Sequence, residues 1–222
     1  IIGSGRGGPL AIYHNDGRGG FTPLSEAFLQ RPAPRDQTAI LGIGGTLFVG
    51  AANYEDGQTN GGCLRIFDTQ RKASGDSVMG NASSAGPLAF GALDGAGPLS
   101  LFIGGRVVPG RYPEPATSLL LRNEGGRFVV AQRFDRLGLV SGAVFTDLDA
   151  DGRPELALAC EWGPIRLFRQ QGGQFVAWDP PVTVRPGPGA EALTGATQLH
   201  ELTGWWTGIA AGDLDGDGRL DL

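Results

Sequence analysis

Residues 147–156 read DLDADGRPEL, and the same pattern returns at residues 213–222 as DLDGDGRLDL. Each copy has carboxylates at positions 1, 3, 5 and 9 and a glycine at position 6. Four carboxylates within nine residues repel one another unless a cation lies among them, and an all-oxygen ligand set suits calcium. The glycine allows the sharp turn that directs the first three acids toward one point. The pattern therefore predicts a metal site in each loop.

Helical calcium modules are the first alternative, because an EF-hand also carries a D-x-D-x-D-G loop. An EF-hand needs a bidentate glutamate at position 12 and a helix on each side, whereas position 12 of the first copy is Leu158. The apolar run after that loop is short and ends at Gly163 and Pro164, which favours a strand. Dockerin modules also place helices after their loops. The sequence argues against both helical modules.

The two loops lie within longer repeats. GLVSGAVFTD at residues 138–147 aligns without a gap on GWWTGIAAGD at residues 204–213. A third, degraded copy at residues 92–105 keeps only Asp94 of the four acids, so it is expected to keep the turn and lose the metal. A second unit contains an apolar strand, a glycine-rich turn and a phenylalanine. It occurs at residues 10–21, 119–128 and 165–175, with a weaker relative at residues 63–68.

The spacing of these repeats predicts the architecture. Corresponding positions at Tyr13, Phe67, Leu121 and Phe168 are separated by 54, 54 and 47 residues. Each interval has room for about four short strands, the content of a propeller blade. We therefore expect an all-β fold, a β-propeller segment truncated at both ends, with about four blades of a larger, seven-bladed propeller. The blades are expected at residues 1–28, 38–80, 85–130, 138–178 and 204–222, the last incomplete, with an inter-blade insertion at residues 179–203.

These repeats resemble the FG-GAP and VCBS repeat β-propellers, a group that includes the propellers of integrin α-subunits. FIGGRVVPGRYP at residues 102–113 and the run at residues 204–213 resemble a bacterial branch close to ASPIC/UnbV-domain proteins and cartilage acidic protein. The resemblance implies that each acidic loop joins two strands of a blade and binds calcium. It assigns as calcium ligands eight carboxylates and two backbone carbonyls: Asp147, Asp149, Asp151, Arg153, Glu155, Asp213, Asp215, Asp217, Arg219 and Asp221.

The sequence departs from the family pattern at three points. Glu155 replaces the usual aspartate, the loop at Asp94 is degraded, and the blade around Leu47 has no acidic loop. No nucleophile or general base recurs beside the loops, and each loop supplies its own carboxylates. We therefore expect two structural calcium ions, each fixing the turn between two strands.

Composition and charge favour a folded protein of the cell exterior. The 39 glycines and 15 prolines lie in periodic turns between apolar runs, which argues against disorder. Eight of the 23 acids fall in the two loops, so the net charge of -5 does not indicate a nucleic-acid partner. No run approaches the ~18 apolar residues of a transmembrane helix. Calcium loops of the weaker kind fill near millimolar calcium, which favours an extracellular, periplasmic or outer cell-surface location.

The expected function is that of a non-enzymatic, calcium-stabilised extracellular propeller whose loops recognise a protein or carbohydrate ligand, as an interaction or cell-adhesion module. The alternative is the scaffold of a secreted calcium-dependent enzyme, a polysaccharide lyase or a dehydrogenase, with catalytic residues on loops or in blades outside this segment. A cluster of His, Lys, Arg or Tyr on the central channel would favour the enzyme. A flat aromatic or acidic loop surface would favour the binding module, because propellers support both functions.

The remaining cysteines and histidines carry weaker signals. Cys63 and Cys160 fall at different points of the repeat, which favours two buried thiols over a disulfide. His14 and His200 are too isolated to form a metal or catalytic set, so we expect both at the surface or in turns.

Tryptophans open the second copy of the long repeat. Trp205 and Trp206 align with Leu139 and Val140, so at least one is expected to pack in the core, the alternative being stacking on sugar rings. The proline-rich insertion that follows Asp179 is either a binding loop or a plain linker.

The repeat alignment predicts how calcium binding responds to mutation. Asp149→Ala and Asp215→Ala should each remove one calcium site, whereas Asp94→Ala should change calcium stoichiometry hardly at all, because its loop lacks three of the four acids. Calorimetric titration with calcium measures the number of sites. Equal loss at all three positions would show that the repeats are misaligned.

Overall fold

The computed structural model describes residues 1–93, 97–183 and 195–222. Within these residues the structure contains no α-helix, and no helix long and apolar enough to cross a membrane. A single turn of 3-10 helix, η2, spans Leu199–Glu201. The strands are β1 (Tyr13–Asn15), β2 (Phe21–Pro23), β3 (Asp36–Ile43), β4 (Thr46–Ala52), β5 (Gly62–Asp68), β6 (Ala73–Met79), β7 (Ser84–Ala92), β8 (Leu99–Val107), β9 (Ala116–Glu124), β10 (Arg127–Thr146), β11 (Glu155–Pro164), β12 (Arg166–Gln171), β13 (Gln174–Trp178) and β14 (Thr203–Trp205).

Neighbouring strands pair antiparallel in chain order. β3, β4, β5 and β6 form one four-stranded sheet, and hydrogen bonding is continuous from β7 through β13. Strand β10 divides that second set, because it pairs with β9 up to Gly138 and with β11 from Leu139 onward. The change coincides with an irregularity between Phe134 and Gly138 and with a positive φ of 52° at Arg136. The last strand of one four-stranded unit is thus also the first strand of the next.

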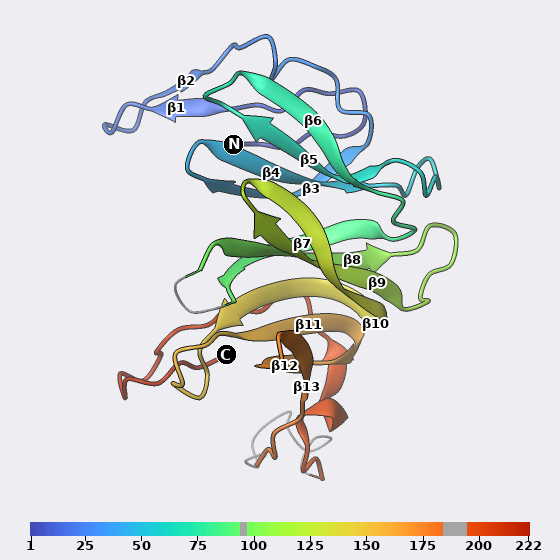
Figure 1. Cartoon of the computed structure of the whole chain (residues 1–222), viewed down its shortest axis with the longest axis vertical. Helices are drawn as coiled ribbons and strands as arrows, with labels where there is room; N and C mark the ends of the chain where they lie inside the picture. The colour runs from blue at the N-terminus through green and yellow to red at the C-terminus, as the bar shows by residue number, and fades with distance from the viewer. Residues whose placement is uncertain (94–96, 184–194) are drawn as a thin grey trace.

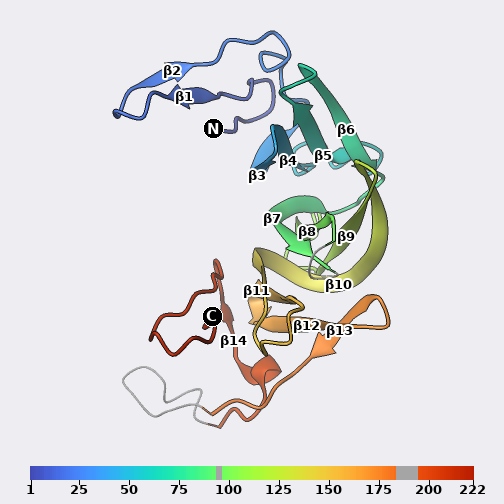
Figure 2. The same cartoon turned by 60° about the vertical axis from the view of Figure 1, so that its left-hand side comes forward.

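The sheets are arranged like the blades of a propeller. They stack one after another along the molecule (Figure 1) and follow an arc whose concave side carries β3, β7 and the end of β10 (Figure 2). Phe67, Leu121 and Phe168 lie in β5, β9 and β12, the third strand of each unit, as the repeat spacing predicts. The all-β, propeller-like fold predicted from the sequence is confirmed. The blade around Leu47 was expected to lack an acidic loop. There β3 and β4 are joined by Gly44 and Gly45.

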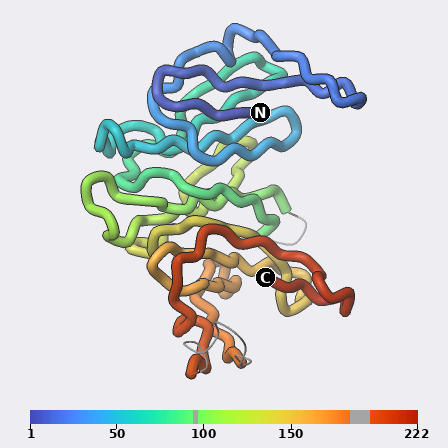
Figure 3. Tube along the Cα trace, turned by 180° about the vertical axis from the view of Figure 1, so that it is seen from behind, coloured from blue at the N-terminus to red at the C-terminus, as the bar shows by residue number. Residues whose placement is uncertain are grey.

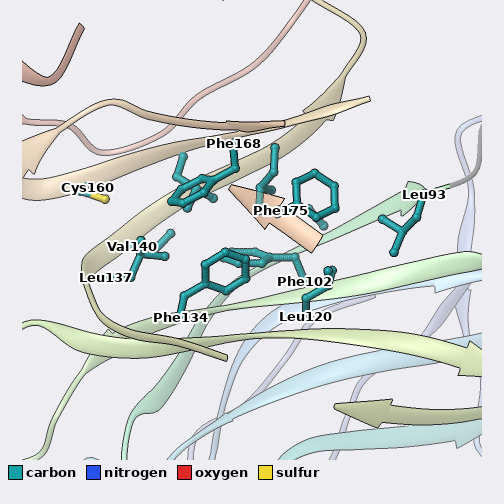
Figure 4. Close-up of a cluster of buried hydrophobic side chains, with 12 residues drawn as sticks. Leu93, Phe102, Leu120, Phe134, Leu137, Val140, Cys160, Phe168 and Phe175 are labelled. Carbon is teal, nitrogen blue, oxygen red and sulfur yellow. The ribbon is translucent and has the colours of Figure 1, made fainter. Parts of the chain in front are cut away.

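The hydrophobic core lies between successive sheets. Strands β8 and β9 bury both faces, so alternate residues reach different clusters: Phe102 and Leu120 face β10–β13, while Leu101 and Leu121 pack toward β4 and β5. Figure 4 shows the cluster that contains Phe102 and Leu120. In it the rings of Phe134 and Phe168 pack edge to face, with their centroids 5.2 Å apart. Each fully buried large side chain contributes roughly 1.5–3 kcal/mol. Burial on both faces explains why these strands read as continuous apolar runs.

The structure places the isolated residues as follows. Cys63 and Cys160 are buried free thiols in different clusters, as the sequence favoured. His14 and His200 are exposed, as expected. Residues 94–96 of the degraded loop, which include Asp94, and residues 184–194 of the insertion lie outside the described residues.

The expectation of core packing by the tryptophan pair is wrong. Trp205 exposes 61% of its surface, and Trp206 is half-buried outside the hydrophobic clusters. The reason is that β14 is only three residues long and pairs only with the end of β11, so no further sheet of the described chain covers it. The chain then runs beside β10 (Figure 3), where a Cβ at Gly142 would lie 2.7 Å from the backbone nitrogen of Ile209.

The junction in β10 predicts a sharp requirement for glycine. Gly138 has a φ of 147°, and a Cβ there would lie 3.2 Å from Sγ of Cys160. Gly138→Ala should therefore lower the free energy of unfolding by about 1–3 kcal/mol, measured by urea denaturation. Gly75→Ala in β6 is the control, because its Cβ would enter open space. Equal stability of the two variants would contradict this role for Gly138.

Candidate metal centres

The first acidic loop connects the end of β10 to the start of β11. Thr146 pairs with Glu155, so the loop is closed at its base by the strand ladder. Backbone N–H groups then orient the first acid: Gly152 donates to Oδ2 of Asp147 at 2.9 Å, and Asp151 donates to Oδ1 at 3.1 Å. Gly152 has a φ of 84°, which lets the chain turn back toward Asp147.

The second acidic loop repeats this arrangement 66 residues later. Gly212 pairs with Asp221, as Thr146 does with Glu155. Gly218, again at φ 84°, donates to Oδ2 of Asp213 at 3.0 Å. Both loops project from the same side of the sheets (Figures 1 and 3). The sequence repeat is therefore also a repeat of local hydrogen bonds.

The ninth position of each loop is fixed by a backbone contact that the sequence did not reveal. The backbone N–H of Leu148 donates to Oε2 of Glu155 at 2.8 Å, and that of Leu214 donates to Oδ2 of Asp221 at 2.8 Å. Glu155 thus accepts the same backbone N–H in its loop as Asp221 does, although its side chain is longer. Position 9 therefore accepts the same backbone N–H in both loops, whether it is a glutamate or an aspartate.

Three carboxylates meet in each loop. The first cluster is Asp147, Asp149 and Glu155, and the second is Asp213, Asp215 and Asp221; within each, one oxygen per residue lies within 4.8 Å of the others. Calcium binds oxygen at 2.3–2.6 Å, so oxygens bound to one ion lie no more than about 5 Å apart. The donor set and its spacing therefore fit a calcium ion.

The fifth-position acids lie outside these clusters. Oδ1 of Asp151 accepts the backbone N–H of Arg153 at 2.8 Å, and Oδ1 of Asp217 accepts that of Arg219 at 2.8 Å. Both aspartates are exposed. The structure thus brings together three of the four predicted carboxylates per loop. Asp151 and Asp217, and the carbonyls of Arg153 and Arg219, remain predicted ligands.

The carboxyl group of Glu155 in the first cluster is buried. Glu155 is only 3% exposed, and this burial raises the pKa of its carboxyl. The N–H of Leu148 acts in the opposite direction, whereas the carboxylates of Asp149, Asp151 and Asp147 raise the pKa further. A buried carboxylate facing three like charges is the situation that a divalent cation relieves.

Position 4 of the loops supplies a matched pair of variants. Ala150 has a φ of 59°, a conformation that strains an L-residue, whereas the equivalent residue of the second loop is Gly216 at φ 79°. Ala150→Gly should raise the free energy of unfolding by about 1 kcal/mol, and Gly216→Ala should lower it by about 1 kcal/mol. Chemical denaturation in calcium-free buffer measures both. Changes of the same sign would show that the two loops do not share a conformation.

Comparison with known proteins supports the repeat. The FG-GAP-like repeat family matches residues 147–222, from the first residue of the first acidic loop to the last residue of the second. No curated protein matches this chain significantly. The segment that carries both acidic loops therefore contains an FG-GAP-like repeat.

Proposed function

We propose that this chain is a calcium-stabilised β-propeller segment that recognises a protein or carbohydrate ligand on or outside a bacterial cell. An FG-GAP-like repeat on an all-β, propeller-like framework suggests an interaction module. The observation that carries the calcium part of the proposal is the pair of loops with matching hydrogen bonds and matching carboxylate clusters. The kinship with VCBS and ASPIC/UnbV-type proteins belongs to the same proposal.

Calcium would act as a structural ion in each loop. It would be held by Asp147, Asp149 and Glu155 in the first loop and by the equivalent acids in the second. Asp147 directly follows the last residue of β10 and Glu155 is the first residue of β11, so an ion held by both would tie two neighbouring strands together. An ion that binds only the folded state stabilises it by mass action. Sites of the weaker kind fill at millimolar calcium, which supports a location outside the cytoplasm.

The surface of the described chain supports recognition rather than catalysis. Tyr112, Trp162 and Trp205 each expose more than half of their area, and the rings of the two tryptophans are in contact. An exposed aromatic surface favours a binding module over an enzyme scaffold in this fold, because aromatic rings provide contact area for a ligand. Tyr112 lies in the connection between β8 and β9, whereas Trp162 lies in β11 and Trp205 in β14.

Thermal unfolding of the full chain with and without calcium tests the calcium part of the proposal. At a free calcium concentration one hundred times Kd, each occupied site should add about 2.7 kcal/mol of stability. Asp149→Asn and Asp215→Asn should each remove about half of the gain and one equivalent in calorimetry. Glu124→Gln, which removes an exposed carboxylate on β9, is the control and should keep the full gain. Identical melting temperatures of the wild-type chain in both buffers would overturn the calcium role.

A further inference from the structure

The end of β11 far from the acidic loop carries an unusual backbone feature. Glu155 begins this strand beside the metal cluster, and Glu161 lies six residues further, roughly 20 Å along the strand. A β-bulge falls between Glu161 and Gly163, where β11 pairs with β14. Trp162, the extra residue of the bulge, has a φ of 57°. A positive φ is strained for a bulky residue, and such strain concentrates at functional positions.

The bulge changes the direction in which Trp162 points. Consecutive residues of a regular strand face opposite sides of the sheet, and Trp205 lies directly across from Glu161 in the ladder. At the bulge, however, the ring centroid of Trp162 comes within 4.6 Å of that of Trp205, at an interplanar angle of 46°. A bulge is a common device for redirecting a side chain. The strained backbone thus brings two indoles together on one surface.

A chain of hydrogen bonds holds this surface in position. Nε1 of Trp162 donates to the hydroxyl of Tyr112, and that hydroxyl donates to Oε1 of Glu161 at 2.6 Å. Arg106 donates to the other carboxylate oxygen. Tyr112 lies in the connection between β8 and β9, so segments distant in sequence converge here. Glu161 is 6% exposed and thereby anchors the aromatic groups from beneath.

Three aromatic side chains are left facing solvent above this anchor. Tyr112, Trp162 and Trp205 expose 52%, 58% and 61% of their area, and we call them the aromatic platform. The charge beneath them is balanced, because Glu161 is paired with Arg106. The Arg106 side chain is 41% exposed and carries five N–H donors. The surface therefore offers apolar ring faces beside hydrogen-bond donors and little net charge.

We propose that the aromatic platform binds carbohydrate. The C–H face of a pyranose ring would lie on an indole, and a hydroxyl at the ring edge would accept a hydrogen bond from Arg106. The inference rests on the proposed recognition function and supplies its ligand class. Its site is separate from the acidic loop at the other end of β11.

The dimensions of the platform favour sugar over the other ligands of aromatic surfaces. Half-exposed aromatic side chains offer on the order of 100 Å² each, far less in total than the about 800 Å² per partner of a stable protein interface. A quaternary ammonium ion needs ring faces that surround it. Here Trp162 and Trp205 contact each other and Arg106 is close by, so a cation would meet no enclosed space and a like charge.

Glycan-array binding by the full chain, followed by calorimetry and tryptophan fluorescence with the sugars that bind, tests the inference. Trp162→Ala and Trp205→Ala should weaken sugar binding at least about 10-fold. Tyr54→Ala, which removes an aromatic residue that is 62% exposed outside the platform, is the control and should bind as the wild type does. Binding to no array member, or binding unaffected by both tryptophan variants, would overturn the carbohydrate assignment. Binding of choline in place of sugars would overturn it as well.

Trp162→Gly separates a binding role from a structural one. Glycine accepts a positive φ without strain, so this variant should unfold at a temperature no lower than that of the wild type while losing sugar binding. A large drop in melting temperature together with retained binding would show that the indole serves the fold instead. Thermal unfolding of the same variants with and without calcium keeps the two proposals apart. If only the sugar site fails, the stability gained from calcium is unchanged.

Discussion

The burial of both faces of the inner strands is the constraint on which the rest of this structure depends. Phe102 packs toward one neighbouring sheet while Leu101 and Ile103 pack toward the other, so β8 contributes to two cores at once. A sheet of this kind is stable only between two others, because its apolar faces would otherwise meet water. The stacked arc of sheets follows directly from this requirement, and the connections between strands are left at the edges, where loops can vary.

The acidic loops lie at one of those edges and have a local explanation. Their hydrogen bonds join residues no more than seven positions apart, such as Leu148 to Glu155, so the same spacing produces the same turn in both copies. Carboxylates held so close together oppose folding electrostatically. A calcium ion would convert that opposition into a link between β10 and β11, which is why we propose a structural role for the ion.

The aromatic platform, unlike the acidic loops, is held by contacts between segments distant in sequence. It combines a strained residue, Trp162, with a buried carboxylate, Glu161, and both features reduce stability unless the surrounding structure compensates. Here Tyr112 and Arg106 supply the compensating hydrogen bonds. The same β11 strand therefore carries a carboxylate that fits a metal at one end and a carboxylate that anchors aromatic rings at the other. The sheet provides the rigid separation between these two surfaces.

The sequence by itself determined the repeat length, the all-β class and the acidic loops, because these depend on alternation and spacing over a few residues. It also indicated two separate thiols and exposed histidines. Only the tertiary structure showed that the Asp151 carboxylate accepts the backbone N–H of Arg153, that Trp205 is exposed, and that Tyr112 donates to Glu161. The contact between Tyr112 and Glu161 joins residues 49 positions apart, and the exposure of Trp205 depends on its pairing with β11 at a bulge. The local sequence pattern does not predict the bulge or this strand pairing, since both form only when the sheets pack.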